Sequence, residues 1–358
     1  MGFSSLLADV AEAGEVTPAQ VLIVDDSVVA RTSLARMIDA TTRFVVAGTV
    51  GNARQALEFL EAHPVEIIVL DLEMPGIDGL TALPDLIAAG RGARVLVVSS
   101  NAADGAAATV HALALGAADT LEKPGTGFVR RFAEVLEERL GRLVESAPEP
   151  VIATGGPPRR TLPVLPPFDI IAIGASTGGI HALSKLLRAI PPDFDVPMLV
   201  TQHLPASFMP YFAAQLALLA GKPCEVATER MAIRPGRILV APGDAHLRCV
   251  RAPGGDVLVR LTHEASASGC MPSVDPMFRA VAEVYGARGL GVVLSGMGRD
   301  GSIGAQDLVA TGGSMLVQDR ASSVVWGMPG AVAGGAGATA VLPPDEIGQA
   351  IAASRSRR

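Results

Sequence analysis

The segment from residue 168 to residue 179 reads Phe168-Asp-Ile-Ile-Ala-Ile-Gly174-Ala-Ser176-Thr-Gly178-Gly179. A short, β-branched apolar run leads into a glycine turn with one serine, and a helical pattern follows. The spacing Gly-x-Ser-x-Gly is typical of a nucleophile elbow, where glycines let the chain turn sharply around a hydroxyl. The amides that open the next helix favour negative charge. The segment therefore predicts a strand–turn–helix unit with Ser176 as a nucleophile. The alternatives are a dinucleotide or phosphate turn, or a purely structural turn.

The composition indicates the class of fold. The chain has 358 residues, of which 49% are apolar and only 4% aromatic. This length suits two domains, and cores of Val, Ile, Leu and Ala favour parallel α/β layers. No run of about 18 apolar residues occurs, and the N-terminus lacks a basic region, so we expect neither membrane insertion nor secretion.

Cysteine content and charge bear on compartment and partners. The three cysteines, Cys224, Cys249 and Cys270, lack metal-ligand spacing, which favours buried free thiols in a cytoplasmic protein. The net charge of −7 argues against a nucleic-acid partner. We assign no role to residues 1–18 or to the basic tail at residues 355–358.

Two repeating α/β patterns flank a proline-rich segment. Before it, five strand-like runs alternate with helical patterns, at residues 21–24, 44–50, 67–70, 95–98 and 118–121. After it, strands are predicted at residues 170–173, 198–202, 237–240, 247–250, 257–261, 290–294 and 314–317, with a hairpin insertion around 253–256. Residues 148–167 contain seven prolines, which predicts an extended linker. The fold class is therefore α/β, with two doubly wound, mainly parallel domains.

Partners for Ser176 are expected at neighbouring strand ends, because parallel strands meet at one edge of a sheet. His203 follows the strand at 198–202 and is the candidate general base, with His246 and His263 as rivals. Asp300 follows the strand at 290–294 and could orient the histidine, although it could equally cap the helix expected at 303–310. Asp275 fits a helix cap better.

An acidic pocket is predicted in the first half. Asp25 and Asp26 end its first strand and Asp71 its third, and three carboxylates at one edge favour a hard cation such as Mg²⁺. Asp71 could then accept a phosphoryl group. Ser99 and Lys123 end two further strands and could contact it. Asp78 is expected to be a helix N-cap.

The motifs of this half resemble those of a two-component receiver domain. They are Val-Asp25-Asp26-Ser, Leu-Asp71-Leu-Glu-Met-Pro-Gly, Val-Ser99-Ser and Glu-Lys123-Pro. The resemblance implies a flavodoxin-like fold, phosphorylation of Asp71 by a histidine kinase, and Mg²⁺ held by Asp25, Asp26, Asp71 and the backbone carbonyl of Glu73. It also implies that Ser99 and Lys123 sense the phosphoryl group. Thr120 departs from the family, in which an aromatic residue is common.

The second half resembles the catalytic domain of the chemotaxis receptor protein-glutamate methylesterases. The matching motifs are Ile171-Ala-Ile-Gly-Ala-Ser176-Thr-Gly-Gly, Thr-Gln-His203-Leu-Pro, Ala241-Pro-Gly-Asp-Ala-His246, Pro272-Ser-Val-Asp-Pro and Ser295-Gly-Met-Gly-Arg-Asp300-Gly. The resemblance implies a Rossmann-like domain with a catalytic triad of Ser176, His203 and Asp300. It also implies a main-chain oxyanion contact at Met297 and a supporting Thr177.

Together the two resemblances predict a receiver domain at residues 19–144, a linker at 145–167 and a methylesterase domain at 168–355. They imply a phosphorylation-activated hydrolase of glutamate methyl esters on chemoreceptors that also deamidates glutamines and needs no metal for hydrolysis. Two alternatives stay open. A dinucleotide-binding oxidoreductase would need an acid at the end of the second strand, which Asp193 and Asp195 precede. A non-enzymatic receiver adaptor would not need the triad.

Overall fold

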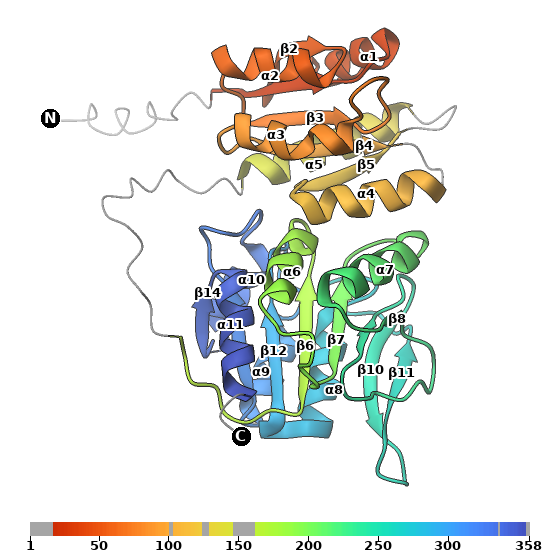
Figure 1. Ribbon diagram of the computed structural model, residues 1–358, viewed down its shortest axis with the longest axis vertical. Coiled ribbons are helices and arrows are strands. Elements are labelled where there is room, and N and C mark those ends of the chain that lie inside the picture. Colours follow the sequence, from red (N-terminus) through yellow and green to blue (C-terminus); the bar gives the residue numbers. More distant parts are fainter. Residues whose placement is uncertain (1–16, 100–102, 124–128, 146–161, 336, 356–358) are drawn as a thin grey trace, which may run out of the picture.

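The computed structural model describes residues 17–99, 103–123, 129–145, 162–335 and 337–355. It contains two parallel sheets, each with helices on both faces, stacked along the long axis of the molecule (Figure 1). This confirms the predicted fold class. No helix in these ranges is both long and apolar enough to cross a membrane.

The first sheet has five parallel strands in the order β2-β1-β3-β4-β5. Its interior strands are buried on both faces, as β-branched apolar runs predict. The strands are β1 (Ala19–Val24), β2 (Phe44–Val50), β3 (Ile67–Asp71), β4 (Arg94–Ser99) and β5 (Asp119–Glu122). The helices between and after them are α1 (Val28–Asp39), α2 (Ala53–Ala62), α3 (Gly79–Ala89), α4 (Ala103–Leu115) and α5 (Val129–Glu145).

The second sheet has seven strands in the order β14-β13-β12-β6-β7-β9-β8, all parallel. They are β6 (Ile170–Ala175), β7 (Met198–Gln202), β8 (Cys224–Val226), β9 (Ile238–Val240), β12 (Gly289–Val293), β13 (Ser314–Gln318) and β14 (Ala340–Leu342). Its helices are α6 (Gly179–Arg188), α7 (Met209–Ala220), α8 (Val274–Tyr285), α9 (Ser302–Ala310), α10 (Gly327–Gly335) and α11 (Pro344–Arg355), with short 3-10 turns η1 (Ala206–Phe208) and η2 (Gly286–Arg288).

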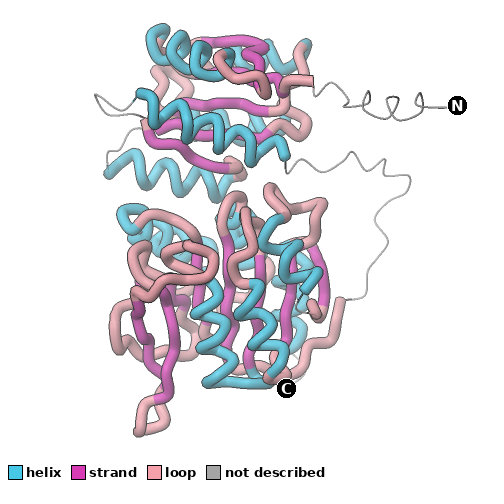
Figure 2. The backbone as a smooth tube through the Cα atoms, turned by 180° about the vertical axis from the view of Figure 1, so that it is seen from behind, coloured by secondary structure: helices cyan, strands magenta, loops and turns pink. Residues whose placement is uncertain are grey.

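The hairpin insertion is separate from this sheet. Strands β10 (His246–Arg251) and β11 (Val257–Thr262) pair antiparallel with each other, as predicted. The turn between them points away from the first sheet in both views (Figure 1, Figure 2). The elements that sequence reasoning did not predict are β8, β14, α10 and α11.

The two halves share an apolar interface. Helix α4 of the first half packs against α6 and α7 of the second, which lie directly beside it in both views (Figure 1, Figure 2). One continuous cluster of buried apolar side chains includes Val110 and Leu113 of α4 together with Leu183 of α6 and Phe212 of α7. Of the proposed linker, residues 146–161 lie outside the described residues. The segment 162–167 has no regular secondary structure, and its Leu165 is buried in the same cluster.

Candidate active site

Ser176 lies on the turn that the sequence predicts. Strand β6 ends at Ala175, and α6 begins at Gly179. The turn depends on Gly178, which has a φ of +74° and no room for a side chain, since a Cβ there would lie 2.4 Å from Cβ of Val324. The Ser176 amide donates to Ser295 O at 2.9 Å, so the loop after β12 lies against the serine.

His203 lies beside this turn because β6 and β7 are neighbours in register, with Ala175 opposite Gln202. The His203 amide donates to Ala175 O at 3.1 Å, and Nε2 of Gln202 donates to Ser176 O at 2.9 Å. The side chains of Ser176 and His203 line the same cavity. In the described part of the chain the Ser176 hydroxyl makes no hydrogen bond, so it is free to turn toward the imidazole.

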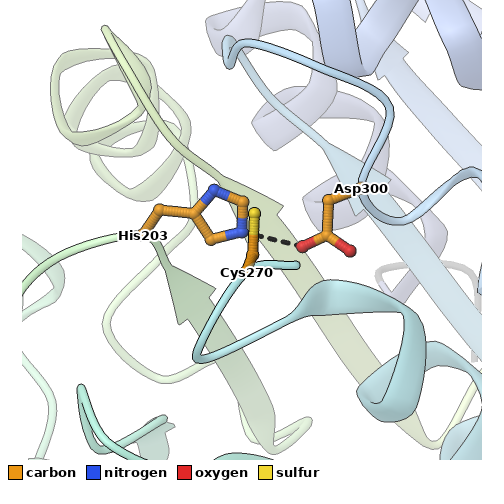
Figure 3. Close-up of side chains that lie close together, drawn as sticks. All are labelled: His203, Cys270 and Asp300. Carbon is orange, nitrogen blue, oxygen red and sulfur yellow. Dashed lines mark hydrogen bonds and ion pairs between the residues drawn. The ribbon is translucent and has the colours of Figure 1, made fainter. Parts of the chain in front are cut away.

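Asp300 comes from a third strand end and orients the histidine. His203 Nε2 donates to its Oδ2 at 2.7 Å (Figure 3). The carboxylate also accepts from Ser273 Oγ at 2.6 Å and from the Val274 amide at 2.8 Å, and it is buried. With Nε2 bound to Asp300, the other ring nitrogen, Nδ1, is the one left to accept a proton from Ser176.

The same contacts shift both pKa values. Burial alone would raise the pKa of Asp300, but the hydrogen bonds from His203, Ser273 and Val274 outweigh it and lower that pKa to about 2. Burial would lower the pKa of His203, but the hydrogen bond to Asp300 and the neighbouring Cys270 outweigh it and raise that pKa to about 9. The pair therefore strongly favours an imidazolium beside a carboxylate.

The structure does not support the alternatives, in which Asp300 caps helix α9 or in which His246 or His263 serves as the base. The N-cap of α9 is Gly301, while Asp275 of α8 caps α9 through its Oδ1, which accepts from the Gly304 amide at 2.7 Å. Both ring nitrogens of His246 are taken, because the Ser273 amide donates to Nδ1 and Nε2 donates to Glu264 O. His263 is exposed and does not line the cavity.

Sequence reasoning missed Cys270, which lies beside His203 and Asp300 (Figure 3). The expectation of three buried thiols is wrong for Cys224 and Cys270, which are both partly exposed, and Cys270 also lines the cavity. The neighbouring His203 lowers the pKa of the Cys270 thiol. Only its position two residues before Pro272-Ser-Val-Asp could have drawn attention to it.

Two main-chain amides at the cavity have no hydrogen-bond acceptor among the described residues. Among the described residues, the N–H groups of Thr177 and Met297 donate no hydrogen bond. Both residues line the cavity with Ser176. Free amides beside a nucleophile can stabilise the oxyanion of a tetrahedral intermediate.

The acidic pocket of the first half is also assembled. Oxygens of Asp25, Asp26 and Asp71 lie within 4.8 Å of one another. Lys123 Nζ donates to Asp71 at 2.7 Å and lies 3.4 Å from Asp25. Burial raises the pKa of Asp71, against the opposing effect of Lys123. Within the described ranges the buried Oδ2 of Asp25 accepts no hydrogen bond and has only the ion pair with Lys123 at 3.4 Å. The three carboxylates therefore fit a hard divalent cation.

Three further residues predicted in the first half, Glu73, Ser99 and Asp78, each make a defined hydrogen bond. The Glu73 amide donates to Asp71 Oδ1 at 3.2 Å, which places Glu73 at this pocket. Among the described residues, Ser99 makes no hydrogen bond to Asp71. Its buried hydroxyl pairs instead with that of Thr109 in α4 at 2.8 Å. Asp78 caps α3 as predicted, since it accepts from the Thr81 amide at 2.6 Å.

The comparisons with known proteins agree with this geometry. A family model described as CheB methylesterase matches residues 171–351, and one described as response regulator receiver domain matches residues 21–127. The protein-glutamate methylesterase/protein-glutamine glutaminase 1 of Paramagnetospirillum magneticum is 38% identical over 95% of this chain and 97% of its own. The chain belongs to the CheB methylesterase family.

Further relatives support this membership. The protein-glutamate methylesterase/protein-glutamine glutaminase 2 of Caulobacter vibrioides is 39% identical over 94% of this chain and 99% of its own. The crystal structure of the Thermotoga maritima CheB methylesterase catalytic domain aligns with a TM-score of 0.50 at 32% identity, over 52% of this chain and 98% of that one.

The receiver domain covers the methylesterase site. A cavity of about 690 Å³ lies between them, lined by Ser176, His203 and Met297 on one side and by Ala118, Asp119 and Arg139 on the other. Ala118 O accepts from the Gly178 amide at 3.0 Å, within the serine turn itself. Ala114 O, at the end of α4, accepts from His181 Nδ1 at 3.1 Å. The receiver main chain thus binds directly to the turn that carries the nucleophile.

Proposed function

We propose that this methylesterase hydrolyses γ-glutamyl methyl esters on chemoreceptors, and deamidates receptor glutamines, through an acyl-enzyme at Ser176. The observation that carries the proposal is the 2.7 Å hydrogen bond between His203 and Asp300 at strand ends adjoining the serine turn. Membership of the CheB methylesterase family supports the same reaction.

Each group has a separate role in the proposed reaction. Ser176 Oγ attacks the ester carbonyl while His203 Nδ1 takes its proton, and Asp300 stabilises the imidazolium. The amides of Met297 and Thr177 donate to the oxyanion. Methanol, or ammonia from a glutamine, leaves with the proton from Nδ1. Water then attacks the acyl-enzyme with the same base and yields glutamate.

The receiver domain supplies control. We assign Asp71 as the phosphoryl acceptor from a histidine kinase, with Asp25, Asp26, Asp71 and the Glu73 carbonyl holding Mg²⁺, which neutralises the phosphoryl oxygens when bound. Lys123 would pair with the phosphoryl group. Ser99 would leave Thr109 to bond it. Because Thr109 belongs to α4, this exchange links phosphorylation to the helix that contacts α6.

The alternative functions fit less well. An oxidoreductase would need an acid at the end of β7, where Gln202 and His203 stand, and Asp193 and Asp195 precede that strand. An adaptor would not need the hydrogen-bonded His203 and Asp300. We place the reaction in the cytoplasm, because kinase and receptor signalling domains act there and all three cysteines are free.

Methanol release from methylated receptor tests the proposal. Ser176→Ala and His203→Gln should each lower kcat by at least about 10³-fold, and Asp300→Asn by less than loss of the serine. Circular dichroism and thermal unfolding would check that each variant is folded. Methanol release by Ser176→Ala at the wild-type rate would overturn the assignment of the nucleophile.

A further inference from the structure

Three metal-ligating side chains meet at the edge of the active site. His203 follows β7, Cys270 lies between β11 and α8, and Asp300 follows β12, so three separate segments converge (Figure 3). One nitrogen, one sulfur and one oxygen from them lie within 4.8 Å of one another. The proposed hydrolysis uses the histidine and the aspartate but gives the thiol no role.

We propose that His203 Nε2, Cys270 Sγ and Asp300 Oδ2 bind one Zn²⁺ ion and that zinc bound there inhibits the esterase. Ligand distances of about 2.0–2.3 Å around tetrahedral zinc place neighbouring donors roughly 3.3–3.7 Å apart. The His203 and Asp300 donors lie 2.7 Å apart, and no two of the three donors are more than 4.8 Å apart, so shifts of roughly 1–1.5 Å or less would bring them to the spacing that zinc requires. The cavity that His203 and Cys270 line has room for a water molecule as the fourth ligand.

The donor set favours zinc over the cation of the receiver pocket. Thiolate and imidazole suit zinc, whereas magnesium takes oxygen ligands such as Asp25, Asp26 and Asp71. The outer contacts already orient the ligands. Ser273 Oγ and the Val274 amide hold the Asp300 carboxylate, and the His203 amide is fixed by Ala175 O. Such support is typical of protein metal sites.

Inhibition follows from the position of one proton. In the active enzyme the uncharged imidazole carries its proton on Nε2, bound to Asp300, and keeps Nδ1 free to accept the serine proton. Zinc on Nε2 displaces that proton, so the uncharged ring must carry its proton on Nδ1. The Cys270 thiol binds as thiolate and releases its proton to solvent. The inhibition, unlike the binding, rests on the proposed role of His203.

Binding is tested on the full chain with Ser176→Ala, in excess Mg²⁺ to fill the receiver pocket. One equivalent of Co²⁺, used as a spectroscopic substitute for zinc, should produce a thiolate-to-metal charge-transfer absorption. Cys270→Ala should abolish the band, while the matched control Cys224→Ala should keep it. Zinc affinity, measured by competition against a coloured chelator, should fall by more than about 100-fold in Cys270→Ala and in His203→Gln. Loss of a residue that only supports a ligand lowers affinity by about 10–100-fold, so the larger fall would identify both residues as ligands. Unchanged affinity in Cys270→Ala would overturn the site.

Inhibition is tested by methanol release, with each protein compared with its own metal-free rate. Wild type should lose activity at stoichiometric zinc and regain it with EDTA. Cys270→Ala should need at least about 100-fold more zinc for the same loss. Binding through Cys270 without loss of rate would overturn the inhibition. A metal-free wild type that releases no methanol would contradict the proposed function instead, and the Co²⁺ result would still decide the site.

Discussion

In the proposed reaction the rate depends most directly on His203, because only its uncharged ring could accept a proton from Ser176. With a pKa of about 9, held there by Asp300 and Cys270 against the effect of burial, roughly one ring in a hundred is uncharged at pH 7. A raised pKa means that the base form appears only as the pH rises. We therefore expect kcat/KM of the unphosphorylated protein to keep increasing well above pH 6.5.

Removing the thiol should shift that profile. Cys270→Ala removes a neighbouring group that helps to raise the pKa of His203, so the ascending limb should move to lower pH and the rate at pH 7 should increase. Methanol release from pH 6 to pH 10, with EDTA present, measures it. Cys224→Ala is the control, since burial raises the pKa of that thiol to about 12 and it does not line the cavity. Superimposable profiles for wild type and Cys270→Ala would contradict the expectation.

Gly178 shows how a single residue limits the serine turn. Gly178→Ala would force an alanine into a left-handed conformation, at about 1–2 kcal/mol, and would place its Cβ 2.4 Å from that of Val324. Gly236 is a matched control, because its φ of +72° is nearly the same but nothing lies within 4 Å of an added Cβ. Denaturant unfolding should show a clearly larger loss for Gly178→Ala than for Gly236→Ala. Equal losses would mean that the contact with Val324 is unimportant.

Helix α4 contacts both the proposed receiver switch and the proposed active site. It carries Thr109, bonded to Ser99, and Ala114, whose carbonyl accepts from His181. Thr109→Val keeps the shape of the side chain but removes a buried hydrogen bond worth about 0.5–1.5 kcal/mol. If that bond favours the arrangement in which the receiver covers the active site, called closed here, the rate of Thr109→Val without phosphodonor should exceed that of wild type by roughly two- to tenfold.

Thr109→Ser, which keeps the hydroxyl, is the control for this change. It should behave like wild type in methanol release without phosphodonor, whereas Thr109→Val should not. A basal rate that is the same in all three proteins would show that the bond between Ser99 and Thr109 does not bias the closed arrangement.

The elements also show what sequence can predict. Strands β3, β6 and β7 are apolar runs with clear ends, so the sequence predicts them. Because the carboxyl ends of parallel strands meet at one edge of a sheet, the segments that follow such ends could be predicted to bring Ser176, His203 and Asp300 together. Strands β8 and β14 have only three residues each at the two sheet edges, too short for a periodic signal. Helix α10 reads Gly-Met-Pro-Gly-Ala-Val-Ala-Gly-Gly, so its residues oppose helix formation and tertiary packing decides.

The position of Cys270 and the orientation of Ser99 were not predictable for another reason. Both depend on loops or helices that approach from a distant part of the chain. Cys270 lies in an irregular segment, and motif spacing does not reveal that this segment folds back onto His203. Ser99 was predicted to bond the phosphoryl group, and in this structure its hydroxyl bonds that of Thr109 instead. The competing hydroxyl of Thr109 belongs to a helix whose rotation about its axis no local pattern determines.

At the scale of the whole molecule, the receiver covers the site and contacts the serine turn. A fragment that begins near residue 148 should therefore release methanol faster than the unphosphorylated full chain, because Ala118 O no longer occupies the Gly178 amide. A small phosphodonor with Mg²⁺ should accelerate the full chain and leave the fragment unchanged. Asp71→Asn should abolish the acceleration. Equal rates for the fragment and the unphosphorylated full chain would show that the receiver does not restrain the esterase.

The limited size of the cavity between the domains should make the protein selective by substrate size while the receiver lies over Ser176. A helix with its side chains is about 10–12 Å wide, so a cylinder of that width filling the cavity of about 690 Å³ would be only roughly 6–9 Å long, less than two helical turns. We therefore expect that a receptor helix cannot present its ester to Ser176 while the receiver is in place, and that a single esterified amino acid can. The unphosphorylated enzyme would then hydrolyse small esters but not esters on a receptor. The ratio of these two rates would report how far the domains have separated.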